Sequence, residues 1–195
     1  MDKNPKITNN GEIDVFTYIL VTVPYYNRYV YAEDQQGQAI TVSGGTDNIL
    51  TSTPLPMFRF ITANTTGSEN NYNALNGDLT NLTQQVNDGW SLVNGYPVVR
   101  PGKDGAGNEQ YFGVIEYAYA YTGESESELQ PLPVGKDTPT LFDKVKLVNV
   151  RENDAYPLEN IFANAPLGVE VTSKCIQTGV GSTDKDTVWE LLKDE

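Results

Sequence analysis

Oxygen-bearing side chains in two turn-like segments are the residues of this chain best suited to chemistry. Asp104, Asn108 and Glu109 lie in "PGKDGAGNE", and Asp184 and Asp186 lie in "STDKD". Carboxylate and amide oxygens in loops are ligands that Ca²⁺ accepts, so these residues are weak candidate calcium ligands. Because neither segment carries the EF-hand pattern, we favour the alternative that both are solvated turns.

The chain has no histidine and a single cysteine, Cys175, which excludes several kinds of active site. Zinc hydrolysis, histidine-assisted nucleophiles and histidine-based pH switches all need an imidazole. In "GVEVTSKCIQTG", Cys175 alternates in phase with Val169 and Val171, which predicts a buried thiol that reacts slowly. We therefore expect no enzymatic activity, no bound metal other than the calcium alternative, and no cofactor.

Charge and hydropathy also limit the partners of this chain. Its 26 acidic and 13 basic residues give a net charge of −13, which repels nucleic acid and anionic lipid alike. No apolar run approaches the 18 residues of a membrane-spanning helix, so we expect no membrane insertion. The chain opens with "MDKNPK", and no signal peptide is visible in it.

Two further clusters have both a functional and a structural interpretation. Glu124, Glu126 and Glu128 alternate in "GESESEL", which suits a cation-binding edge, but we favour an acidic loop that keeps the protein soluble and guards a sheet edge. The tyrosines at 117, 119 and 121 could stack on sugars. Their alternation with alanine instead favours one face of a packed sheet.

The spacing of apolar residues predicts an all-β protein of one domain, residues 1–195, with a short C-terminal helix. Strands are predicted in residues 15–23, 89–100, 111–121, 140–150 and 169–175, a hairpin in 27–42, and a capped helix at the end of the chain. Residues 62–110 are predicted as an insertion with loops, irregular and partly helical between 62 and 89.

The segment "GEIDVFTYILVTVP" predicts a strand that is buried on both faces. Its odd positions, from Ile13 through Val15 to Val23, are apolar, and its even positions Phe16, Tyr18 and Leu20 are nearly as apolar. Because proline lacks a donor N–H, Pro24 is expected to end the ladder.

Three separated segments resemble the TasA and camelysin group of secreted Gram-positive proteins, which use a SipW-type signal peptidase. These segments are "KNPKITNNGEIDVFTYILVTVP", "VNDGWSLV" with "YFGVIEYAYAY", and "LPVGKDTPTLFDKVKLVNV" with "GVEVTSKCIQTG". The matching positions are Lys3, Pro5, Ile7, Asn9, Gly11, Val21, Val23, Pro24, residues 87–90, 117–121 and 141–145, Ile176 and Gln177. The chain departs from the family pattern at residues 174–175, where an alanine is usual.

The resemblance implies a jelly-roll-like antiparallel β-sandwich that is extracellular, either secreted or associated with the cell surface. It further implies a structural subunit of biofilm-matrix fibres, assembled head to tail by N-terminal donor-strand complementation, with other matrix or surface proteins as further partners. The alternative is a non-polymerising, adhesin-like surface module that binds glycan or protein. Because the first strong strand begins near residue 13, we expect an unpaired sheet edge beside it. The expected subunit junction comprises Asp2, Lys3, Asn4, Pro5, Lys6, Ile7, Thr8, Asn9 and Asn10.

Overall fold

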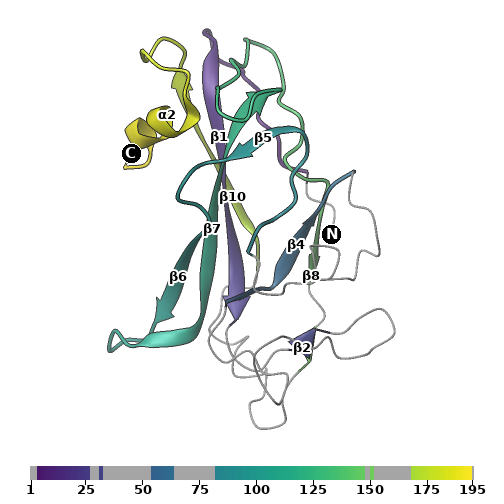
Figure 1. Ribbon diagram of the computed structural model, residues 1–195, viewed down its shortest axis with the longest axis vertical. Coiled ribbons are helices and arrows are strands. Elements are labelled where there is room, and N and C mark those ends of the chain that lie inside the picture. The colour runs from purple at the N-terminus through teal and green to yellow at the C-terminus, as the bar shows by residue number, and fades with distance from the viewer. Residues whose placement is uncertain are drawn as a thin grey trace.

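A computed structural model describes residues 4–26, 31–32, 54–63, 82–147, 150–151 and 168–194. Its largest element is a sheet in the order β10-β1-β7-β5, in which β6 also pairs with β7 and β3 with β1 (Figure 1). The strands of this main sheet are β1 Val15–Tyr26, β3 Leu55–Pro56, β5 Gly89–Leu92, β6 Val98–Lys103, β7 Glu109–Gly123 and β10 Glu170–Gln177.

Two short strand pairs accompany the main sheet. They are β4 Phe58–Ile61 with β8 Lys144–Leu147, and β2 Tyr31–Ala32 with β9 Val150–Arg151. Every strand pairing among the described residues is antiparallel. The predicted all-β class is therefore confirmed, whereas the jelly-roll topology stays a prediction.

The strand β1 lies in the middle of the main sheet, between β10 and β7. Its odd residues, among them Ile19 and Val21, enter one buried cluster, and Phe16 and Tyr18 enter another on the opposite face. The prediction of a strand covered on both faces is confirmed. Ile13 precedes the strand and is 53% exposed, so its place in the apolar pattern was wrong.

Pro24 does not end the strand, contrary to the sequence prediction. Pairing with β10 stops at Thr22, and pairing with β3 begins at Tyr25. The Pro24 carbonyl accepts the Met57 N–H at 2.8 Å, so the missing donor of Pro24 faces the side where β1 changes partner. Because Pro24 takes part in the pairing as an acceptor and loses only the bond that it would donate, the strand continues to Tyr26.

The strand β7 divides its side chains between two layers. Ile115, Tyr117 and Tyr119 point into the cluster that the β4 and β8 pair covers, and the Phe60 and Phe142 rings stack there at 4.2 Å. The small residues Ala118 and Ala120 point to the opposite face. Figure 1 shows the β4 and β8 pair and the helix on opposite sides of the main sheet, which gives a sandwich-like arrangement.

The predicted C-terminal helix is present as α2, Lys185–Leu192. Asp184 caps it by accepting the Thr187 N–H at 2.8 Å, and Val188 and Trp189 pack on the second face of the sheet. Small side chains on β7 leave room for the Trp189 ring, which lies 5.2 Å from the ring of Tyr18. No helix among the described residues is both long and apolar enough to cross a membrane.

Other boundaries differ from the sequence predictions. The strand character predicted for residues 89–100 is confirmed, because β5 and the first part of β6 lie there and both pair with β7 in the main sheet. The described residues 62–63 and 82–89 contain no helix, and residues 64–81 lie outside the described part. The strand predicted for 140–150 is confined to β8 and β9, and the hairpin of 27–42 is described only at β2.

Candidate functional site

Residues 4–10, the N-terminal segment, pair with residues 135–141 of the same chain. Ile7 accepts the Thr138 N–H at 2.9 Å, Asn9 donates to the Lys136 carbonyl at 2.9 Å, and Asn9 also accepts the Gly135 N–H at 2.7 Å. The pairing is antiparallel at Thr8 and Asp137. This arrangement holds the segment by an isolated β-bridge and its flanking backbone bonds.

Side chains reinforce the pairing. The amide of Asn9, which is 5% exposed, donates to the carbonyls of Ile13 and Leu132 at 2.9 Å each. Lys6 forms an ion pair with Asp137. The Lys6 ammonium, with the Thr8 hydroxyl, holds the pKa of the Asp137 carboxyl below its ordinary value.

Residues 10–14 link this segment to β1, and all of them are exposed. The Gly11 N–H donates to the Asn9 Oδ1 at 3.0 Å, which makes a local turn. Ile13 and Val134, the latter 46% exposed, add apolar surface near this link. The link is therefore solvent-accessible, and its further bonds lie at the end next to β1, where Ile13 accepts from Asn9 and Asp14 accepts from Val134 and Thr178.

The structure places the predicted junction residues in two groups. Asp2 and Lys3 lie outside the described part of the chain, whereas residues 4–10 lie against their own chain. The expected unpaired edge beside β1 is wrong, because β10 and β7 flank that strand. The prediction failed because β10 comes from the far end of the chain, and sequence position alone does not show that it pairs there.

The strand β10 is instead an edge of the main sheet. In an antiparallel pair, the N–H and C=O groups of successive residues point alternately toward the partner strand and away from it. The Thr178 N–H donates to the Asp14 carbonyl, so the backbone groups of the even-numbered residues of β10 point toward β1. The backbone groups of Val171, Ser173 and Cys175 therefore point outward, and they bond to no other described residue. Such an edge is able to pair with another strand.

The first calcium candidates form a self-contained turn between β6 and β7. The Asp104 carboxylate accepts the N–H groups of Ala106 and Asn108 at 2.9 and 2.8 Å, and the Asn108 side-chain amide at 2.9 Å. These bonds lower the pKa of Asp104. Glu109 is the first residue of β7 and pairs with Lys103. The Asp104 oxygens thus serve the turn itself.

The second pair of candidates stabilises the start of α2. Asp184 is the N-cap, and its bond to Thr187 lowers its pKa. Asp186 accepts the Asn94 backbone N–H at 2.8 Å and its side-chain amide at 2.6 Å. In Figure 1, α2 and the turn between β6 and β7 lie at opposite ends of the molecule. Among the described residues, no three acidic or cysteine side chains gather as a metal site.

The predicted burial of Cys175 is wrong, although its predicted phase is right. Cys175 lies opposite Thr17 and on the same face as Val171, which packs against the core. The core cluster that packs on Val171 does not include Cys175, and the thiol is exposed. Desolvation by the surrounding protein still raises the pKa of the thiol above its ordinary value.

The tyrosines of β7 divide into buried and partly buried residues. Tyr117 and Tyr119 are 1% and 2% exposed, with parallel rings 6.1 Å apart, so they cannot stack on a sugar. The Tyr117 hydroxyl donates to the Leu82 carbonyl at 2.6 Å, and burial raises its pKa to about 12. Tyr121 is half-buried against Trp90. The structural interpretation is confirmed for the first two residues.

The acidic loop packs against the approach to α2. Glu128 accepts from the Thr183 hydroxyl, and its backbone N–H donates to the Ser125 Oγ at 2.9 Å. Backbone bonds from Leu129 to Thr183 and from Lys185 to Ser127, at 2.7 and 2.9 Å, join the two segments. Glu124 and Glu126 stay exposed.

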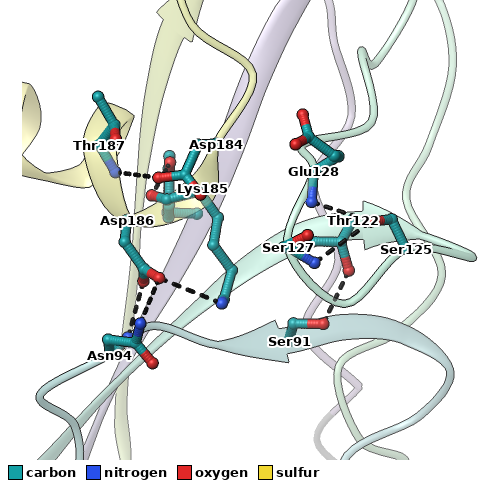
Figure 2. A network of polar contacts seen from close by, with 11 residues as sticks. Ser91, Asn94, Thr122, Ser125, Ser127, Glu128, Asp184, Lys185, Asp186 and Thr187 are labelled. Atoms are coloured by element: carbon teal, nitrogen blue, oxygen red, sulfur yellow. Dashed lines mark hydrogen bonds and ion pairs between the residues drawn. The ribbon is translucent and has the colours of Figure 1, made fainter.

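This junction borders an open polar pocket of about 670 Å³ between β5, the loop that follows β7 and the start of α2. Figure 2 shows the Lys185 side chain extending from α2 toward the part of β5 that carries Ser91. Ser91 and Thr122 form a hydroxyl pair at 2.9 Å. The lining residues are Val86, Asn87, Asp88, Gly89, Trp90, Ser91, Leu92, Thr122, Gly123, Glu124, Ser125, Glu126 and Lys185.

No local sequence pattern predicts this pocket. A lysine in the first turn of a helix ordinarily predicts a solvated side chain, yet Lys185 is 7% exposed. Its cover comes from β5 and from the loop after β7, which are distant in sequence. The sequence signal that was present is the cluster of small hydroxyl residues around 122–127.

Comparisons of this chain with protein-family models, with curated proteins and with solved structures give no match.

Proposed function

We propose that this chain is a structural subunit of extracellular bacterial fibres, of the kind that the TasA and camelysin resemblance implies. In this proposal it has no enzymatic role, and it acts outside the cell or at its surface. The observation that carries the proposal is the N-terminal segment, which an isolated β-bridge and backbone bonds hold to residues 135–141. A terminal strand held mainly by backbone bonds is an element that identical subunits are able to exchange.

Exchange is favoured by the link between this segment and β1. Residues 10–14 are exposed, so this link is accessible to solvent along its whole length. The exchanged segment makes the same bonds to a neighbour that it makes to its own chain, so the main cost is the entropy of association. Ile13 and Val134 supply exposed apolar surface near the junction that assembly is able to bury.

When every subunit passes its segment to the next one in the same direction, the contact between subunits is heterologous, or head to tail. Each subunit gives its segment to the next and receives one from the previous copy, so the assembly grows as a filament instead of closing as a dimer. The corrected position of the sheet edge does not affect this route, because the acceptor is the 135–141 segment and not β1.

A disulfide lock tests the exchange directly. Thr8 and Asp137 form a non-hydrogen-bonded antiparallel pair, since the flanking bonds run from Thr138 to Ile7 and from Asn9 to Lys136. Such pairs bring Cα atoms to about 4.5 Å, which a disulfide accommodates. The variant Thr8→Cys/Asp137→Cys is made in a Cys175→Ser background, which also serves as the unlocked control.

We expect the oxidised variant to remain monomeric in light scattering and electron microscopy. Addition of reductant should restore filaments at the rate of the control. Filaments formed equally well by the oxidised variant would refute exchange of this segment. A parent protein that stays monomeric at every concentration and temperature tested would refute the fibre function itself.

The alternative function is an adhesin-like surface module that does not polymerise. The polar pocket beside Lys185 is the specific observation that favours it. Two lining residues, Asn87 and Trp90, bond to Leu141 and Pro139 of the 135–141 segment, so the pocket adjoins the acceptor of the N-terminal segment. Lys185 makes no bond to that segment, so a substitution of Lys185 separates the two functions by experiment.

A further inference from the structure

The pocket beside Lys185 has walls that are fixed by the fold. Backbone bonds join Lys185 to Ser127 and Leu129 to Thr183 on one side. On the other side, β5 pairs with β7 through Ser91 and Ala120. The space between them is therefore formed before any ligand arrives, as is usual for small-molecule sites.

The ammonium of Lys185 is weakly satisfied for a buried charge. Its side chain is 9% exposed, and the one acceptor among the described residues is the Asp186 Oδ2, at 3.4 Å. That carboxylate is shared with Asn94, whose two bonds to it are shorter (Figure 2). Because an ammonium carries three N–H donors, Lys185 retains donors for an oxygen placed in the pocket.

Acceptors stand at the rim of the same pocket. Asp88, Glu124 and Glu126 line it and are exposed, and none of them bonds to a described side chain. The hydroxyl pair of Ser91 and Thr122 lies on its wall. The pocket is therefore lined by the Lys185 ammonium, a buried hydrogen-bond donor, and by exposed carboxylates, which are acceptors.

This charge pattern discriminates among ligand classes. A simple anion that approaches Lys185 meets the carboxylates at the rim, and a simple cation that enters meets the ammonium. A neutral ligand with several hydroxyl groups avoids both costs, because each hydroxyl is able to donate to a carboxylate or accept from the ammonium. Trp90 adds an aromatic wall, held in place by its bond to the Pro139 carbonyl at 3.2 Å.

We propose that this pocket binds a neutral, hydroxyl-rich ligand of the size of a mono- or disaccharide, with Lys185 and Glu126 as polar contacts. The volume of about 670 Å³ lies within the range of small-molecule sites. The polar lining favours a carbohydrate over an apolar ligand, because a polar group buried without a partner loses affinity.

The test is a titration of ¹⁵N-labelled protein, followed by amide chemical shifts. The probes are cellobiose and N,N′-diacetylchitobiose, with inorganic phosphate and spermidine as the anionic and cationic comparators. We expect a disaccharide to shift the amides of residues 89–92, 122–126 and 185 saturably. Neither comparator should do so at the same concentration. No change with either disaccharide, or a larger change at these amides with a comparator, would overturn the proposal.

Variants assign the contacts. Lys185→Met keeps the length of the apolar stem and should weaken disaccharide binding by at least about 10-fold, the loss expected for a hydrogen bond from a charged donor. Glu126→Gln changes an exposed side chain, so the fold is not at risk, and should weaken binding by about threefold. Glu170→Gln, on β10, is the matched control and should bind like the parent. Unchanged binding by a folded Lys185→Met or by Glu126→Gln would refute the assigned contacts.

Discussion

The substitution Asn9→Ala is expected to loosen the N-terminal segment more than any other single change within it. The Asn9 amide donates to the carbonyls of Ile13 and Leu132, and its Oδ1 accepts the Gly11 N–H. No other residue of the segment has a side chain that ties the pairing, the turn and the start of β1 together. The exposed neighbour Asn10 provides the matched control, Asn10→Ala.

The expected loss follows from the fate of the three partners of Asn9. A hydrogen bond contributes about 0.5–1.5 kcal/mol net, which bounds the loss between roughly 1.5 and 4.5 kcal/mol. Gly11 and Ile13 are exposed and regain water, and the Leu132 carbonyl keeps the Val15 N–H at 3.3 Å. The loss should therefore lie near the lower bound, at about 2 kcal/mol, and Tm should fall by about 4–8 °C for a chain of this size.

Urea unfolding and native-state hydrogen exchange measure this loss separately. If the segment opens only with the whole domain, the midpoint of urea unfolding falls while the m-value is unchanged. If the segment opens locally, the amides of Asn9 and Thr138 exchange faster while the global unfolding is nearly unaffected. Asn10→Ala should change neither. An Asn9→Ala protein that matches Asn10→Ala in both measurements would refute the anchoring role of Asn9.

Two further predictions concern other parts of the sheet. Gly113→Ala should destabilise the domain by about 3 kcal/mol in urea unfolding, because its Cβ would lie 2.2 Å from the Arg100 carbonyl oxygen, whereas Gly105→Ala meets no atom within 4 Å and should be neutral. A Gly113→Ala protein as stable as the parent would contradict the close approach of β6 and β7. Cys175 should react with a thiol reagent in the native protein, with a rate that rises with pH as the thiolate forms above the ordinary thiol pKa. Labelling that requires denaturant would show that its face is covered.

The elements predicted correctly are those whose signal is local. The run from Val15 to Val23 is dense in β-branched and aromatic residues, and the alternation of tyrosine with alanine fixes both faces of β7. The helix α2 has its cap, Asp184, and its apolar spacing within a few residues. Each of these features is contained in one short stretch of the chain.

The incorrect predictions all depend on contacts between segments that are distant in the sequence. Whether Pro24 ends a ladder depends on where β10 stops and β3 begins, and these partners lie far from Pro24 in sequence. Cys175 follows the apolar phase, but its burial depends on cover that the fold does not extend to that end of β10. Lys185 is buried by β5 and the loop after β7, whose arrangement no local pattern encodes.

The fold offers two physically distinct routes to self-association. Exchange of the N-terminal segment re-forms existing bonds in another copy, so it needs the closed pairing to open first. Addition of a strand to the outer edge of β10 makes new bonds, and it is opposed by the charges of Glu170 and Lys174 on that strand. Lys174 also bonds to the Leu192 carbonyl, which ties the end of α2 to the edge strand. A disulfide between positions 8 and 137 prevents the first route, and β10 is the same in the locked protein and in its Cys175→Ser control. Assembly by the locked protein at the rate of that control would therefore assign filament growth to the edge strand.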